Sequence, residues 1–235
     1  MGRKLKIILL ESALERVPRE LWGHPQVVRS ARRYGVRPGD MLLDKSLHYN
    51  AMSTLSQKWK RGRPDIVHVA LLNILDSPLA SMGLLDVYLH VYDGRVFRVL
   101  PETRIPKSYE RFRGLMAQLL EVERVPPTGE PLIYKAYDSL SEFASDHGGL
   151  ILLWERGTPA SPGYVFTRAY YSGLPLGIGA FPRGDFKRST LRKARESYSI
   201  YGGYPLKAWT VASRILCAGE EIIGVGATSS SSQSS

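Results

Sequence analysis

Two glycine-containing turns towards the C-terminal end have the residue types that can bind a small ligand through main-chain atoms. Residues 181–184 read FPRG and follow an apolar run at 176–180, and residues 198–204 read YSIYGGY. Glycine lacks a side chain, so backbone amides and carbonyls in such turns can approach a ligand closely. The alternative is an ordinary αβ unit whose glycines only form turns. Neither a G-x-G-x-x-G dinucleotide motif nor a P-loop motif accompanies them.

Asp65 lies where the sequence WKRGRPDIVHVA (residues 59–70) changes abruptly from cationic to apolar. Gly62 and Pro64 break any helix, so we predict a strand at residues 66–72 with Asp65 at its mouth. A loop residue in that position can be presented to a ligand. From the local sequence, a carboxylate that caps or closes the turn is an equal alternative.

The stretch PETRIPKSYERFR (residues 101–113) combines positive charge with aromatic rings. The side chains concerned are Arg104, Lys107, Tyr109, Arg111, Phe112 and Arg113. Cations hold phosphates and rings stack on unpaired bases, so this pattern favours single-stranded RNA as a ligand. Alternatively, the two rings anchor the helix that follows, and both interpretations can hold together.

The net charge of +10 is concentrated in three segments. Residues 1–65 carry +8, residues 104–113 carry +3 and residues 183–195 carry +5, whereas the rest of the chain carries −6. Clustered Lys and Arg gain binding energy by displacing counterions from phosphates, so this distribution indicates a polyanion-binding face. The alternative is a solvated basic surface that maintains solubility.

The cysteine and histidine content argues against disulfide and metal chemistry. The single cysteine, Cys217, excludes an intrachain disulfide and a multi-cysteine zinc site, and we interpret it as a packed helix residue. The five histidines are scattered without HExxH or other ligand spacing: His24, His48, His68, His90 and His147. We therefore expect no metal. A GxSxG elbow is also absent, so an acyl-transfer serine has no support.

Length and hydropathy favour one cytoplasmic domain. The 235 residues are 43% hydrophobic, which is enough to bury a core. No apolar run approaches the ~20 residues of a membrane span, and the basic start lacks a signal-peptide hydrophobic region, so we expect a soluble protein with no membrane partner. We predict a single domain at residues 1–225 and a disordered Ser-rich tail at 226–235.

Strands and helices alternate along the rest of the chain and must position these candidate residues. An Asp93-Gly94 turn between β-rich runs predicts an antiparallel hairpin. Asp185 is placed to cap a basic helix, and Pro205 to begin the last helix. The predicted strands are 5–10, 66–72, 84–92, 95–100, 132–134, 149–154 and 176–180, and the other predicted helices are 27–34, 46–59, 112–122 and 139–147. This pattern indicates an α/β fold whose mostly parallel sheet is flanked by helices, with the hairpin as a small attachment.

Strings of sequence in a fixed order resemble a known family. They are LKIILLESALERVP, LLDKSLHYNAM, RGRPDIVH, PETRIPKSYERFRGLMAQLL, GAFPRGDF, YSIY and AWTVASRILCA, and they extend over nearly the whole chain. The chain thereby resembles the pseudouridine-N1-specific methyltransferases of small-subunit ribosomal RNA, which belong to the SPOUT class. The resemblance implies a SPOUT-type α/β knot with a C-terminal trefoil knot, a homodimer formed through the knot helices, and S-adenosyl-L-methionine as cofactor.

The resemblance also implies the site residues. Cofactor binding falls on Leu153, Gly179, Phe181, Gly184, Ile200, Tyr201 and Leu206, and RNA binding falls on Arg63, Asp65, Arg104, Lys107 and Arg111. Position 107 departs from the family, in which arginine is expected. Lysine keeps the positive charge but lacks the bidentate fork of a guanidinium group. Gly202-Gly203 makes the second turn more flexible than the family pattern.

The implied activity is transfer of a methyl group from S-adenosylmethionine to N1 of a pseudouridine in a ribosomal RNA loop, in small-subunit biogenesis. N1 carries a proton that must leave, which makes Asp65 the candidate proton acceptor and Arg63 the candidate group that keeps Asp65 ionised. A structural role for Asp65 in the Gly62-Arg63-Pro64 turn remains open. The alternative function is a non-catalytic RNA-binding ribosome assembly factor that uses the same basic face.

Overall fold

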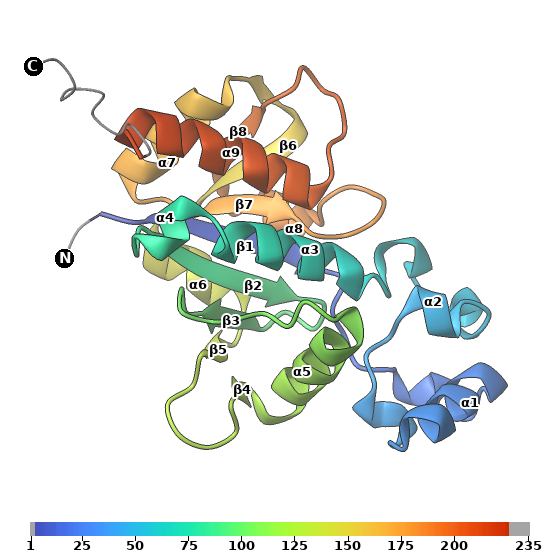
Figure 1. Ribbon diagram of the computed structural model, residues 1–235. Coiled ribbons are helices and arrows are strands. Elements are labelled where there is room, and N and C mark those ends of the chain that lie inside the picture. The colour runs from blue at the N-terminus through green and yellow to red at the C-terminus, as the bar shows by residue number, and fades with distance from the viewer. Residues whose placement is uncertain (1–2, 226–235) are drawn as a thin grey trace, which may run out of the picture.

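A computed structural model describes residues 3–225, in which one eight-stranded sheet forms the centre (Figure 1). The strand order is β4-β5-β3-β2-β1-β7-β6-β8. The strands are β1 (Leu5–Ser12), β2 (Leu85–Val91), β3 (Val96–Val99), β4 (Arg124–Val125), β5 (Ile133–Tyr137), β6 (Leu150–Pro159), β7 (Leu176–Gly179) and β8 (Ala194–Ser199). The Ser-rich tail predicted at residues 226–235 lies outside the described residues.

The middle of the sheet is parallel, as predicted. β1 pairs in parallel with β2 and β7, and β6 pairs in parallel with β7 and β8. β3, β5 and β4 continue the sheet in antiparallel fashion. The predicted hairpin is confirmed as β2 and β3, and through β2 it is continuous with the main sheet.

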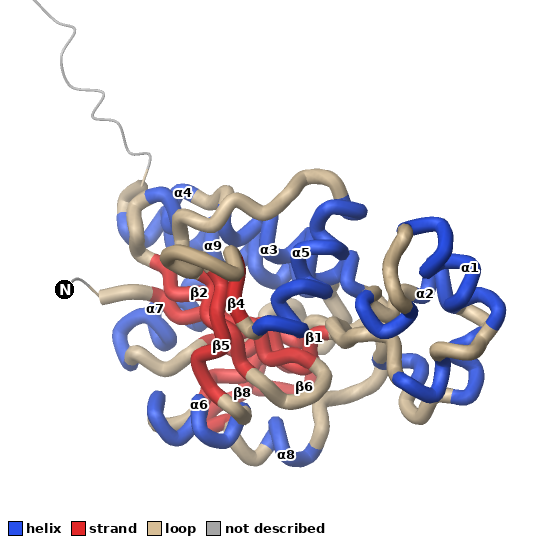
Figure 2. The backbone as a smooth tube through the Cα atoms, turned by 90° about the horizontal axis from the view of Figure 1, so that it is seen from below, coloured by secondary structure: helices blue, strands red, loops and turns tan. Residues whose placement is uncertain are grey.

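Helices cover both faces of the sheet (Figure 2). In β1, Ile7 and Leu9 belong to the core beneath α3, α5, α7 and α9, whereas Ile8 and Leu10 belong to the core beneath α6. The apolar run of β1 is therefore explained by burial on two faces. The helices are α1 (Pro25–Tyr34), α2 (Lys45–His48), α3 (Pro64–Leu75), α4 (Pro78–Ser81), α5 (Tyr109–Val122), α6 (Leu140–His147), α7 (Pro162–Ser172), α8 (Arg188–Leu191) and α9 (Ala208–Ile223).

A helical lobe at residues 17–60 stands beside the sheet and has a small core of its own (Figure 1). It contains α1, α2 and the short 3-10 turns Arg19–Leu21, Pro38–Asp40, Ala51–Thr54 and Lys58–Lys60. The long helix predicted at residues 46–59 is wrong, because the chain there forms three short turns rather than one helix.

The strand predicted at residues 66–72 is also wrong, because this segment belongs to α3. Pro64 occupies the first turn, where its missing N–H costs nothing, and Asp65 also lies in the first turn. Buried Ile66, Ala70 and Ile74 recur at helical spacing. α3 then packs beside α9 (Figure 1).

Two predictions about helix starts fail near the C-terminus. Asp185 does not cap a helix: the N-cap of the four-residue α8 is Lys187, without a side-chain cap. Pro205 precedes α9, whose N-cap is Lys207. Cys217 lies on α9 as expected, but it is exposed rather than packed. Among residues 3–225, no helix is both long and apolar enough to cross a membrane.

Candidate functional site

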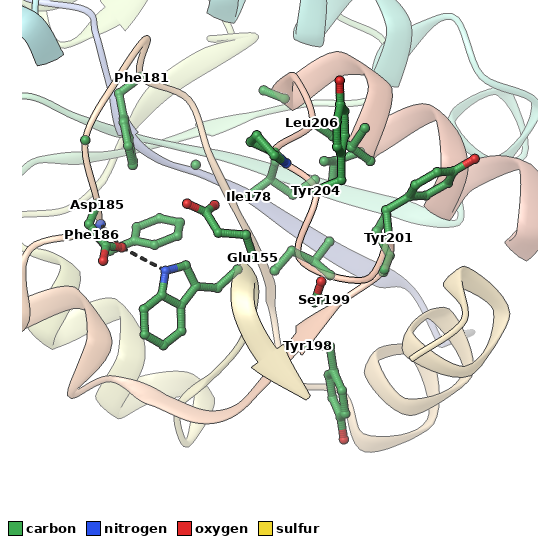
Figure 3. A pocket seen from close by; sticks show the side chains of 18 of the residues that line it. Glu155, Ile178, Phe181, Asp185, Phe186, Tyr198, Ser199, Tyr201, Tyr204 and Leu206 are labelled. Carbon is green, nitrogen blue, oxygen red and sulfur yellow. Dashed lines mark hydrogen bonds between the residues drawn. The ribbon is translucent and has the colours of Figure 1, made fainter. Parts of the chain in front are cut away.

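A cavity of about 300 Å³ lies at the C-terminal ends of β6, β7 and β8 (Figure 3). Ligands bind at this edge of parallel sheets because the loops that follow the strands converge there. The structure brings all seven predicted cofactor residues onto its walls: Leu153, Gly179, Phe181, Gly184, Ile200, Tyr201 and Leu206. Two loops form most of the lining, the first loop (residues 179–187) and the second loop (residues 199–207).

The first loop is shaped by two aromatic rings and two glycines. Phe181 and Phe186 meet edge to face, with ring centroids 5.3 Å apart. A Cβ at Gly179 would lie 3.0 Å from the Phe186 ring and 3.1 Å from the Phe181 ring. Gly184 has φ +93°, and a Cβ there would lie 3.3 Å from Trp59 Nε1. Glycine at these positions therefore serves close packing and a left-handed backbone.

Asp185 attaches the first loop to β6. Its Oδ1 accepts hydrogen bonds of 2.8 Å from Trp154 Nε1 and from its neighbour Phe186 N (Figure 3). Its Oδ2 lies 3.3 Å from Arg156 Nη1. The carboxylate thus has a partner 31 residues away in sequence, which explains why it does not cap α8.

The second loop closes the opposite wall. Gly202 and Gly203 both have left-handed φ values, and Gly203 N donates to the buried Ser199 Oγ at 2.9 Å. Tyr201 and Tyr204 expose large parts of their rings, and Leu206 lies beside Tyr204 (Figure 3). The wall is therefore made of aromatic and aliphatic side chains on a turn-rich backbone.

Sequence reasoning missed Trp154 and Glu155, which also line the cavity. Glu155 is exposed, and Figure 3 shows its carboxylate directed between the first loop and Ile178. The change within β6 from buried Leu150–Leu153 to polar residues was the available signal, because the end of the buried part reaches the ligand-binding edge of the sheet. A carboxylate there can accept hydrogen bonds from ligand hydroxyl or ammonium groups.

The predicted RNA residues cluster around the start of α3. Arg63 donates two hydrogen bonds of 2.7 Å to Asp65, from Nε to Oδ1 and from Nη2 to Oδ2. Their side chains are 37% and 38% exposed. The hydrogen bonds that Arg63 donates to Asp65 raise the pKa of Arg63. Asp65 forms no side-chain cap at the helix start, so its partner is the Arg63 side chain rather than the backbone.

The basic loop (residues 101–111) packs against the same helix. His68 Nε2 lies 2.7 Å from Pro106 O, and the His68 ring stacks on the buried Phe112 ring at 4.4 Å. Tyr109 OH donates a hydrogen bond to Asp44 Oδ2 at 2.7 Å. The pKa of Tyr109 is raised, mainly by burial and to a lesser extent by this hydrogen bond. The two rings therefore anchor the start of α5, as the second interpretation predicted.

The cations of the basic loop remain available to a ligand. Arg104, Lys107 and Arg111 are exposed. The contact between His68 and Pro106 places the loop beside α3, whose first turn contains Asp65. The structure thus brings all five predicted RNA residues to one region.

Comparison with known proteins identifies the family. The family model described as EMG1/NEP1 methyltransferase matches residues 7–220. The chain belongs to this family. The predicted resemblance is confirmed, and with it the SPOUT-class α/β fold; the knot remains a prediction.

Relatives in the EMG1/NEP1 family match almost end to end. The chain is 63% identical over 219 residues to the ribosomal RNA small subunit methyltransferase Nep1 of Aeropyrum pernix, covering 93% of this chain and 98% of that protein. It is 42% identical over 220 residues to Nep1 of Saccharolobus solfataricus, covering 94% and 98%. The crystal structure of Archaeoglobus fulgidus Nep1 bound to S-adenosylhomocysteine matches with a TM-score of 0.83 and 37% identity, covering 95% of this chain and 100% of that one.

Metal ligation finds no support in the part of the chain that the structure describes. Within residues 3–225, no group of three or more His, Cys, Asp and Glu side chains could hold a metal ion. His48 and His90 are instead buried, and burial lowers the pKa of each to about 4. His90 Nδ1 accepts a hydrogen bond from Glu11 N at 3.1 Å, which requires the neutral ring.

Proposed function

We propose that this protein uses S-adenosyl-L-methionine to methylate N1 of a pseudouridine in a loop of small-subunit ribosomal RNA, in small-subunit biogenesis. The observation that carries the proposal is the match of 93% and 95% of the chain to two Nep1 methyltransferases, the second of them bound to S-adenosylhomocysteine. The cavity at the strand ends supports it, because a purely RNA-binding assembly factor needs no such pocket. Because the substrate would be ribosomal RNA, we propose the cytoplasm as its place of action.

The cavity fits this cofactor in size and chemistry. Its volume of about 300 Å³ lies at the lower end of typical ligand sites. Glu155 could accept hydrogen bonds from ribose hydroxyls or the ammonium group, and Arg183 could pair with the carboxylate. Phe181, Ile200 and Leu206 supply apolar surface. When bound, the cofactor supplies a methyl group on a sulfonium.

Arg63, Arg104, Lys107 and Arg111 would hold the phosphates of the RNA loop. Asp65 would accept the proton that N1 loses or orient the base through it. Its pairing with Arg63 orients the carboxylate, and each carboxylate oxygen retains a lone pair for a further hydrogen bond. The alternative is a purely structural Arg63–Asp65 pair that shapes the start of α3.

A homodimer is proposed from the residues of α9 and α3 that remain exposed. On α9, Ile215 and Leu216 are buried within the chain, so they serve its own core. Ile222 on α9 is 47% exposed and Val69 on α3 is 41% exposed. Apolar side chains on two adjacent helices favour a two-fold contact with a second copy.

The test combines cofactor binding with methyl transfer. We expect calorimetry to detect S-adenosylmethionine binding to the free protein, and labelled methyl groups to enter an RNA loop that contains pseudouridine. The matched control is the same RNA with uridine, in which N1 is glycosylated and cannot be methylated. Cofactor binding without transfer to the pseudouridine RNA would reject the proposed substrate, and RNA binding without cofactor binding would favour the assembly factor.

A further inference from the structure

Two buried ion pairs join the end of β1 to the turn that precedes α3. Glu11 pairs with Lys60, and Glu15 pairs with Arg61. All four residues are less than one tenth exposed, at 5%, 6%, 8% and 6% respectively. Burying charges is costly unless each is paired and hydrogen-bonded, so such pairs call for a specific role.

The Glu11–Lys60 pair holds the first loop at three points. Glu11 Oε1 accepts a hydrogen bond of 2.8 Å from Lys187 N, at the end of that loop. Lys60 Nζ donates to Asp185 O and lies 4.0 Å from the centre of the Phe181 ring. Phe181 and Asp185 both line the cavity. The Lys60 ammonium group therefore contacts the Phe181 ring, the Asp185 carbonyl and the Glu11 carboxylate, and so connects this wall of the cavity to β1.

Glu11 is held in an unusual backbone conformation that aims it at the loop. Its φ is +50°, in the left-handed region that residues with a side chain rarely adopt. Its N–H donates to His90 Nδ1 at 3.1 Å, which fixes the peptide from the side of β2. Strain of this kind persists where surrounding contacts over-determine it, and it concentrates at functional sites.

From these contacts we infer that Lys60 and Glu11 are positioning residues of the cofactor site. Neither residue lines the cavity; they hold the first loop in the conformation that lines the cavity before the cofactor arrives. A preorganised loop avoids the entropy cost of ordering on binding, so its loss reduces affinity. This inference rests on the proposed cofactor site.

The neighbouring pair provides a matched control. Arg61 donates to Glu15 at 2.8 Å and 2.6 Å, donates to Ser56 O and lies 4.6 Å from the Tyr92 ring. None of these residues lines the cavity. The control pair thus connects the same two segments with similar burial, but without contact to the first loop.

The experiment compares Lys60→Met with Arg61→Met. Each removes one buried cation, so both should lower the melting temperature. S-adenosylhomocysteine affinity, measured by calorimetry well below both melting temperatures, should fall about tenfold or more in Lys60→Met, because a charged hydrogen bond to the loop is lost. In Arg61→Met it should stay within about twofold, and RNA affinity should be unchanged in Lys60→Met.

Equal loss of cofactor affinity in the two variants would overturn the inference, because it would reflect general destabilisation. Unchanged affinity in Lys60→Met would overturn it as well. If Lys60→Met does not fold, the double variant Glu11→Gln/Lys60→Met leaves no unpaired charge and is measured in its place, with the same expected loss. Failure of the unsubstituted protein to bind S-adenosylhomocysteine would instead reject the proposed function.

Discussion

Replacing Asp185 by alanine should release the first loop from β6 and weaken cofactor binding. Asp185 Oδ1 accepts two hydrogen bonds of 2.8 Å, one of them from Trp154 on β6. Hydrogen bonds to charged groups contribute roughly 1.5–3 kcal/mol each, but the half-buried Trp154 can bond to water in the variant. We therefore expect a combined loss of about 1.5–3 kcal/mol, which corresponds to about 10- to 150-fold in Kd. Arg156 is 70% exposed, so its ion pair contributes at most about 1 kcal/mol.

The assay is calorimetric titration with S-adenosylhomocysteine at a temperature where every variant is folded. Asp185→Asn keeps an acceptor oxygen and should bind more tightly than Asp185→Ala. Arg156→Ala removes only the exposed ion pair and should change Kd by no more than about fivefold. Wild-type affinity in Asp185→Ala would refute the reasoning, since the loop would then hold its shape without this carboxylate.

Four further outcomes are expected. Asp65→Asn should slow single-turnover methylation by about 10²- to 10⁴-fold while cofactor affinity and Tm hold; a full rate at saturating RNA would leave only a structural role. Replacing Arg104, Lys107 or Arg111 by alanine should make the slope of log K for RNA binding against log salt concentration shallower by ~0.7 to 0.9. Unchanged slopes in all three variants would exclude phosphate contacts. Ile222→Asp should dissociate the proposed dimer, which light scattering would detect as a halved molar mass. A monomeric unsubstituted protein in the same measurement would reject the interface. Burial lowers the pKa of His90 to about 4 from the ordinary ~6.5, so its contribution to stability is present above pH ~6.5 and is lost as pH falls towards 4. Urea unfolding of His90→Gln should therefore show a flatter pH dependence by up to ~1.4 kcal/mol per unit in that window, and an unchanged slope would contradict a neutral His90.

Local sequence signals predicted the elements whose burial or turn geometry determines the residue types of the segment itself. The apolar run of β1 and the Asp93-Gly94 hairpin were predictable because burial on two faces and turn geometry leave direct marks. The segment after Pro64 was misassigned, since Ile66 and Val67 have high strand propensity. Proline followed by an acidic residue was the helix-start signal that should have decided it.

Contacts between distant residues account for the other failures. The partner of Asp185 in the first loop is Trp154 on β6, which is 31 residues away in sequence. From the neighbouring sequence alone, helix capping was the only role that could be predicted for Asp185. The same holds for Lys60, whose partner Glu11 is 49 residues away, and for β8, which forms only by pairing with β6. The family resemblance supplied the cavity-lining residues, but the polar Glu155 was missed because its position depends on where the buried part of β6 ends.

The central place of β1 has a consequence for how the protein is made. β1 leaves the ribosome before both of its neighbours, β2 on one side and β7 on the other, where Ile7 lies opposite Leu176. During synthesis, strands β1 to β5 can assemble once residue 137 has emerged, leaving one edge of β1 open. That edge is a hydrogen-bonding template until residues 176–179 arrive. The cavity is built on strands that join afterwards, so a nascent chain reaches ligand-binding competence only after the second loop has been translated.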